Sequence, residues 1–63
     1  RIEVARTLNN LGNALIDLKE YDRAKEVLEK ALVIKEKHYG KDHIEVARTL
    51  NNLGVVLCYL KEY

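Results

Sequence analysis

RIEVARTLNNLGNALIDLKEY, residues 1–21, decides the fold, because the chain repeats it almost unchanged as HIEVARTLNNLGVVLCYLKEY at residues 43–63. The two stretches are identical at 16 of 21 positions, and the offset between them is 42 residues. A period of this length is the signature of a repeat architecture, in which each unit stacks on its neighbour. The 63 residues therefore read as a single domain with one full unit, residues 1–42, and the first helix of the next unit.

Apolar residues recur along each stretch at the spacing of one face of an α-helix. In residues 1–21 they are separated by alternate steps of four and three, and residues 43–63 repeat the pattern. The two stripes comprise Val4, Leu8, Leu11, Leu15 and Leu18, and then Val46, Leu50, Leu53, Leu57 and Leu60. A third stripe lies between them at Ala24, Val27, Leu28, Ala31 and Ile34. This periodicity predicts an all-α fold of three helices, at about residues 2–18, 22–38 and 43–61.

Polar residues and one glycine mark the predicted helix ends. The short break at residues 19–21 makes the first two helices antiparallel neighbours, and the repeat makes the third helix parallel to the first. Asp22 is predicted to cap the second helix through its carboxylate. Gly40 is predicted to end that helix in a left-handed conformation, and Asp42 with Glu45 forms a D-x-x-E pattern typical of a capped helix start.

Charge and composition exclude several classes of protein. The 11 basic and 10 acidic residues leave a net charge of +1, which argues against a nucleic-acid module with a basic face. No apolar run approaches the ~18 residues of a membrane span, so we expect no membrane insertion. The single cysteine, Cys58, excludes an internal disulfide framework and fits a reducing compartment, for which we expect the cytoplasm.

Taken together, these residues resemble a tetratricopeptide repeat. The signature appears as Leu8-x-x-Leu11-Gly12-x-x-Leu15, followed by Tyr21, Ala24, Leu28 and Ala31. The usual repeat has 34 residues and a proline where this chain has Glu36. The 42-residue unit and the words T-L-N-N-L at residues 7–11 and 49–53 are similar to the extended repeats of kinesin light chain. Gly12 is then expected at a close crossing, against the Ala24–Ala31 side of the second helix.

The resemblance implies a scaffold for protein–protein interaction, an alpha-alpha superhelix whose concave groove is lined by the first helix of each unit. The groove stripe it implies comprises Arg6, Asn9, Asn10, Asn13, Ile16 and Asp17, and then Arg48, Asn51, Asn52, Val55, Cys58 and Tyr59. Asparagine can both donate to and accept from a peptide backbone, and arginine can fork onto a carboxylate. We therefore expect a peptide or protein partner, with an acidic or asparagine-compatible peptide in the groove.

Two alternatives stay open at this point. Adjacent asparagines are poor helix formers, so their repetition indicates either a ligand or a ladder of hydrogen bonds between neighbouring helices. Val55 and Tyr59 form either an apolar pocket or a surface for a following helix. Accordingly, the chain is either an adaptor that binds a peptide or a structural spacer that stacks on itself. The near-identity of the two units also permits a designed or recently duplicated array.

No catalytic, cofactor or metal site is expected from the sequence. Cys58 has no adjacent base, so it is better explained as an inert thiol than as a nucleophile. His38, Asp42 and His43 cluster around a loop, but a metal site needs three or four ligands in a fitting geometry. The chain has no serine and no glycine-rich phosphate loop. We expect a protein that is not an enzyme.

The half-unit at the end of the chain predicts self-association. The third helix lacks its own second helix, so Leu50, Leu53, Val55, Val56 and Leu57 are expected to form an open apolar patch. The first helix is expected to expose the surface that a preceding unit would meet. Copies of the chain should then stack end to end, as an open superhelix rather than a closed dimer.

Overall fold

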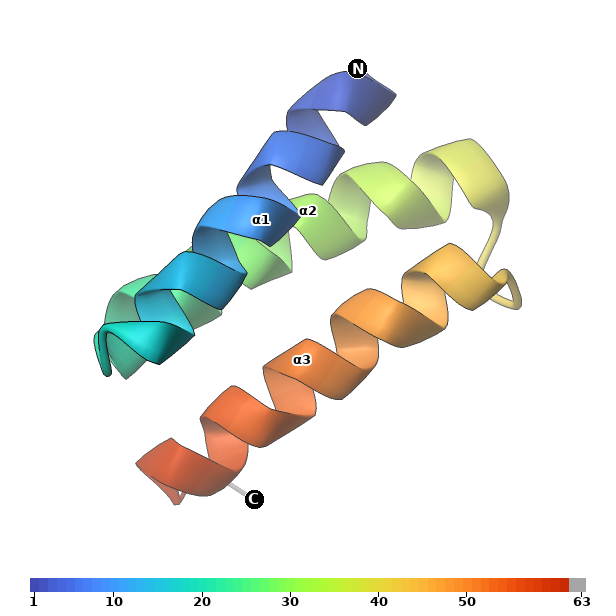
Figure 1. Ribbon diagram of the computed structural model, residues 1–63. Helices are drawn as coiled ribbons and strands as arrows, with labels where there is room; N and C mark the ends of the chain where they lie inside the picture. Colours follow the sequence, from blue (N-terminus) through green and yellow to red (C-terminus); the bar gives the residue numbers. More distant parts are fainter. Residues whose placement is uncertain (62–63) are drawn as a thin grey trace.

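Three α-helices make up the fold in the computed structural model, which describes residues 1–61 (Figure 1). They are α1 (Ile2–Asp17), α2 (Tyr21–Tyr39) and α3 (Ile44–Leu60), each within one residue of its predicted bounds. Figure 1 shows α2 running against α1, and α3 running in the same direction as α1, as predicted. Within residues 1–61 there is no strand, and no helix is both long and apolar enough to cross a membrane.

The central element is α2, which packs against both other helices, whereas α1 and α3 touch each other much less. Its inner stripe of Ala24, Leu28 and Ala31 is completely buried. Two of the three residues are alanines, which let the neighbouring backbones approach closely. The core cluster consequently forms along α2, with Leu15 from α1 and with Leu53 and Val56 from α3.

The crossing of α1 and α2 depends on Gly12, as predicted. A Cβ atom added to Gly12 would lie 2.6 Å from Cδ2 and 2.7 Å from Cγ of Leu28. Because Leu28 has no exposed surface and sits between Ala24 and Ala31 on α2, it has little freedom to move away. Leu28 therefore packs directly against the backbone of Gly12.

The prediction of a single apolar stripe on the first helix is wrong. The face of α1 that meets α2 contains the small residues Ala5 and Gly12 together with Leu15, all buried. A second apolar edge, formed by Val4, Leu11 and Leu18, is 49%, 47% and 66% exposed. The apolar arc of α1 is thus wider than the surface that α2 covers.

In α3 the edge that is exposed on α1 is buried, and the edge that packs against α2 on α1 is open. Val46 and Leu53, the repeat equivalents of Val4 and Leu11, are buried against α2, with Leu60 partly buried. Leu50 is 47% exposed, and Gly54, the equivalent of Gly12, has nothing within 4 Å of an added Cβ atom. The open patch predicted for α3 therefore contains Leu50 and Val55 but not Leu53 or Val56, because α2 covers the latter two.

Backbone conformations with positive φ end the helices. Lys19 and its repeat equivalent Lys61 have φ of 63° and 58°, in the left-handed region that favours glycine. The turn after α1 is closed by the backbone N–H of Glu20, which donates to the carbonyl of Leu15 at 2.8 Å. Gly40 ends α2 with φ 88° and ψ 160°, a conformation that is essentially restricted to glycine. Gly40 is therefore outside the left-handed helical region that we predicted.

The helix caps also differ from the prediction. Glu20 rather than Asp22 occupies the N-cap position of α2, and Asp22 lies in the first turn, where its charge suits the helix dipole. For α3 the capping residue is His43 rather than Asp42, since Nδ1 of His43 accepts a hydrogen bond from the Glu45 N–H at 3.0 Å.

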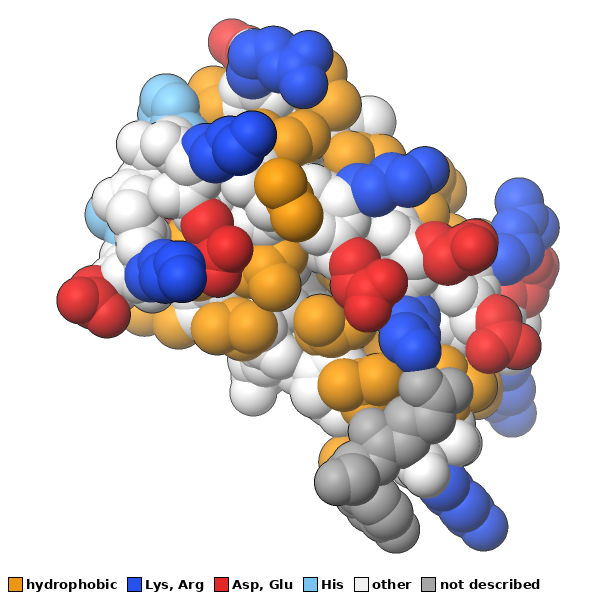
Figure 2. Space-filling view, turned by 180° about the vertical axis from the view of Figure 1, so that it is seen from behind, with side chains coloured by type: hydrophobic (Ala, Val, Ile, Leu, Met, Phe, Trp, Pro, Cys, Tyr) orange, Lys and Arg blue, Asp and Glu red, His pale blue; other side chains and the backbone are white. Residues whose placement is uncertain are grey.

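The surface opposite to the view of Figure 1 is a mixture of both charge signs (Figure 2). Lysine, arginine, aspartate and glutamate side chains are interspersed there with apolar patches. The exposed residues of α2 include Glu26, Glu29 and Lys30, spaced as expected for a solvated outer face. Neither positive nor negative charge dominates, so this surface does not attract partners of one charge over the other.

Exchanging each helical glycine for alanine provides a matched test of the helix packing. Gly54→Ala should raise the free energy of unfolding by up to about 1 kcal/mol, because alanine is the better helix former and the site is open. Gly12→Ala should lower it by about 1–2 kcal/mol, because the overpacking against Leu28 exceeds that gain. Urea unfolding followed by circular dichroism measures both free energies. Equal changes in the two variants would contradict a close crossing of α1 and α2 at Gly12.

Candidate functional site

A polar pocket of about 250 Å³ lies where all three helices meet. α1 contributes Arg6, Asn9 and Asn10, α2 contributes Lys35, and α3 contributes Glu45 and Arg48. The repeat-equivalent arginines Arg6 and Arg48 therefore lie on the same side of the molecule, as the groove hypothesis requires. Other hollows lie elsewhere, one of them of about 350 Å³ beside Val33 and Ile34, but they lack this pairing of arginines and asparagines.

Lys35 forms the floor of the pocket. Its side chain is only 3% exposed, although lysine is rarely buried without a partner. Nζ of Lys35 lies 3.6 Å from Oε1 of Glu45, whose side chain is 32% exposed. The distance is that of an ion pair and exceeds the range of a charge-assisted hydrogen bond, about 2.7–2.9 Å.

The carboxylate of Glu45 bridges two cations. While Oε1 faces Lys35, Oε2 lies 3.6 Å from Nη1 of Arg48, which is 68% exposed. With Arg6 included, the pocket holds three cations and one carboxylate, a local excess of two positive charges. Such a site favours anionic groups over neutral or cationic ones.

Glu3, the repeat equivalent of Glu45, has a different environment. It is exposed and lies 3.4 Å from the N-terminal ammonium group. The pKa of its carboxyl lies below the usual value. The main cause is hydrogen bonding to its own backbone N–H, and the second is the nearby ammonium group. The pairing of Glu45 with a buried lysine thus comes from the helix that precedes α3, not from the repeated stretch itself.

Asn9 bridges α1 and α3. Its Oδ1 accepts a hydrogen bond from the hydroxyl of Thr49 at 3.1 Å, and Thr49 is completely buried. Thr49 also approaches the carbonyl oxygen of Glu45, at 3.4 Å. This is the kind of contact that the ladder alternative required, whereas Asn10 is exposed and faces the pocket.

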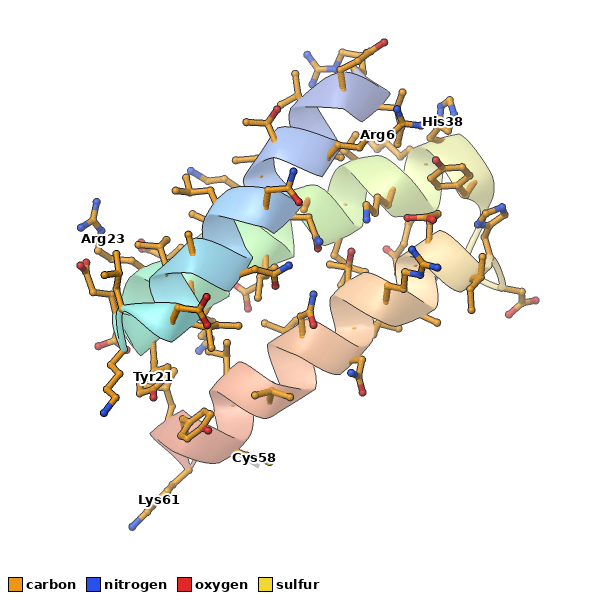
Figure 3. The ribbon with its side chains drawn as sticks, in the orientation of Figure 1. Arg6, Tyr21, Arg23, His38, Cys58 and Lys61 are labelled. Carbon is orange, nitrogen blue, oxygen red and sulfur yellow. The ribbon has the colours of Figure 1, made fainter. Side chains whose placement is uncertain are left out.

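The remaining residues of the predicted groove stripe do not line this pocket. Exposed on α1 or α3 are Asn13, Asp17, Asn51, Val55 and Cys58, and Ile16 and Asn52 are partly buried. Tyr59 stacks on Tyr21, with ring centroids 4.6 Å apart and an interplanar angle of 6°. Figure 3 shows Tyr21 at the start of α2, directed toward the end of α3. That stack holds the far end of α3 against α2.

Lys35 and Glu45 were missing from the sequence-based set. A signal for Lys35 exists, because the buried positions of α2 continue from Ala24, Leu28 and Ala31 to residue 35 in steps of four, three and four. A lysine at that register is a buried cation, and such a group needs an acidic partner. The sequence does not show which of the ten acidic residues supplies it.

The two histidines near the connection between α2 and α3 contact the ring of Tyr39. Tyr39 stacks on His43 with centroids 4.2 Å apart, and His38 meets Tyr39 edge-on at 4.7 Å. Among residues 1–61 no group of three or more potential ligands is arranged to hold a metal ion. Cys58 is an exposed free thiol, and Figure 3 shows it on the side of α3 away from Arg6.

Comparison with known proteins places the chain in one family. A family model described as tetratricopeptide repeat matches residues 3–63. Two curated proteins are each 49% identical over 39 residues: "Secreted RxLR effector protein RXLR-C07" of Plasmopara halstedii and "RxLR effector protein SFI4" of Phytophthora infestans (strain T30-4). Each match covers 62% of this chain but only 12% of the relative. No solved structure matches. The finer resemblance to kinesin light chain stays a prediction.

The contact between Asn9 and Thr49 can be measured with a double-mutant cycle. Thr49→Val and Asn9→Ala should show a coupling energy of about 0.5–1.5 kcal/mol, the usual net value of one hydrogen bond. The repeat-equivalent pair Thr7→Val and Asn51→Ala serves as the control, because both side chains are exposed. Urea unfolding of the four single variants, the two double variants and the unchanged chain checks this, and equal coupling in the two cycles would refute the bridge.

Proposed function

The chain belongs to the tetratricopeptide repeat family, and on that premise we propose that it binds an acidic peptide of a protein partner in the pocket between α1 and α3. Members of this family generally mediate protein–protein interactions, and its repeats are typically not catalytic. The binding set we propose comprises the pocket residues Arg6, Asn9, Asn10, Arg48 and Lys35. Along α1 and α3 outside the pocket it continues with Asn13, Asp17, Asn51, Asn52, Val55 and Tyr59. Here the partner is a peptide rather than a nucleic acid or a membrane.

The observation that carries this proposal is the buried cation beside two arginines. The side chain of Lys35 is buried in a pocket that is also lined by Arg6 from α1 and Arg48 from α3. Asn10 lies exposed beside them and can both donate to and accept from a peptide backbone. Carboxylates of a peptide can pair with these cations, and the backbone of an extended peptide can form hydrogen bonds with the side-chain amide of Asn10.

A blocked tetraglutamate peptide tests the proposal, with blocked tetraglutamine as the uncharged comparison. The tetraglutamate peptide should bind, and Arg6→Gln or Arg48→Gln should each weaken binding roughly twofold to fivefold, the value of one partly exposed ion pair. Raising the salt concentration should weaken binding further, because screening acts on exposed charges. Isothermal titration calorimetry measures the affinities.

Arg23→Gln is the matched control for the loss of one positive charge. Arg23 pairs with Glu20 at 2.7 Å, outside the pocket, and Figure 3 shows it at the opposite end of the helices from Arg6. This variant should bind like the unchanged chain. Equal affinity for the two peptides, or no binding of either, would reject acidic-peptide recognition.

A second candidate function is self-assembly into a stacked array, and the open edges of α1 and α3 favour it. The edge on α1 contains Val4, Leu11 and Leu18, and the edge on α3 contains Leu50 beside the empty space at Gly54. Complete burial of a fully exposed side chain of this kind stabilises by roughly 1.5–3 kcal/mol, and covering these half-exposed side chains contributes about half of that each. Because the two edges differ, contact between them is head-to-tail and continues as an open superhelix.

Complementary blocking variants separate head-to-tail stacking from a two-fold dimer. Leu11→Glu blocks the α1 edge and Leu50→Glu blocks the α3 edge, so neither variant alone should associate in sedimentation velocity at high concentration. Mixed together they should form one-to-one dimers through their intact edges. If Leu11→Glu alone still dimerised, pairing of α3 with α3 would replace the stacking proposal, and a monomeric unchanged chain would end it.

We place this binding role in the cytoplasm. Cys58 has an exposed free thiol, and exposed thiols persist best in a reducing compartment. One of the two relatives is named a secreted protein, and its match to this chain covers 12% of its length.

A further inference from the structure

The pairing of Lys35 with Glu45 is incomplete as a hydrogen bond. Both cations that face the carboxylate stand 3.6 Å from it, so it neutralises Lys35 and Arg48 without closing tightly on either. A buried ammonium group is stable only with a counterion and with hydrogen-bond partners. Because Lys35 also lines the pocket, an oxygen ligand that enters the pocket can approach its ammonium group.

The backbone of Glu45 is fixed, whereas its side chain has room to rotate. His43 accepts a hydrogen bond from the Glu45 N–H at 3.0 Å, and the hydroxyl of Thr49 approaches the Glu45 carbonyl at 3.4 Å. The side chain of Glu45 is about a third exposed, unlike that of Lys35. Rotation of Glu45 toward solvent would therefore free the cations and leave the start of α3 in place.

We propose that Glu45 is an internal occupant of an anion subsite built on Lys35, and that a side-chain carboxylate of the bound peptide displaces it. This inference rests on the proposed function and adds a selectivity mechanism to it. In the free protein Glu45 supplies the charge that the buried Lys35 requires. In the complex the peptide carboxylate supplies it, and Glu45 turns to solvent or stays beside Arg48.

An internal competitor of this kind filters ligands by charge. A neutral peptide cannot replace Glu45, because the exchange would leave Lys35 buried without a counterion. An acidic peptide replaces one carboxylate by another, so the buried lysine is paired before and after binding. Glu45 thus lowers the affinity for acidic peptides moderately and prevents neutral peptides from reaching the floor of the pocket.

Glu45→Gln tests this inference with the same two blocked peptides. Removal of the competing charge should strengthen tetraglutamate binding roughly threefold to tenfold over the unchanged chain, because one like charge near the ligand is lost. Glu29→Gln is the matched control, since Glu29 is exposed on the outer face of α2, and its affinity should be unchanged. In the double variant Glu45→Gln with Lys35→Met the gain should disappear.

Lys35→Met alone keeps the inference testable if Glu45→Gln does not fold, because an apolar side chain suits a buried position. This variant should fold and bind tetraglutamate at least tenfold more weakly, with Arg6 and Arg48 intact. Binding by the unchanged chain with no gain in Glu45→Gln, or with full affinity in Lys35→Met, overturns the displacement and leaves the proposed function standing. Absence of tetraglutamate binding in every variant overturns both.

Discussion

The packing of Leu28 onto the bare backbone of Gly12 is the constraint on which the rest of the structure depends. It sets how closely α1 approaches α2, and only a residue without a side chain permits that approach. Lys35 lies seven residues, about two turns, beyond Leu28 on the same buried stripe. The same helix face that packs Leu28 against Gly12 therefore also carries Lys35, which lines the pocket together with Arg6 and Arg48. Stability and the candidate site share one helix face.

Much of the fold could be predicted because two independent signals coincided: the spacing of apolar residues and the exact 42-residue offset. The number, direction and bounds of the helices followed from these signals, and so did the position of Gly12. The assignment of Leu11 to the core did not, since Leu11 and Leu53 are the same residue in the same local sequence, yet one is exposed and the other buried. Burial depends on which neighbouring helix is present, and local sequence does not encode that.

The candidate site was predictable to a smaller extent. The resemblance to the tetratricopeptide repeat predicted that Arg6, Asn9, Asn10 and Arg48 lie on one side, and all four line the pocket. Glu45 recurs as Glu3, but Lys35 belongs to a different helix outside the repeated stretch, so no periodic signal links the two. Of the two alternatives for the asparagines, a ligand site or hydrogen bonds between helices, neighbouring residues fit different ones. Asn9 contacts α3 through Thr49, whereas Asn10, one residue later, faces the pocket.

The two unlike edges of the repeated helix have a consequence for how a gene encoding such units can change. The edge that α3 turns toward α2 is present, nearly unaltered, on α1, where it is open. A 42-residue segment inserted or deleted in frame therefore creates no new kind of junction, because each added unit presents the same two surfaces as the one it follows. Unequal recombination between near-identical stretches can lengthen or shorten the array one unit at a time. A change of length by one unit therefore requires no new packing between helices, so selection can act on the reach of the array alone.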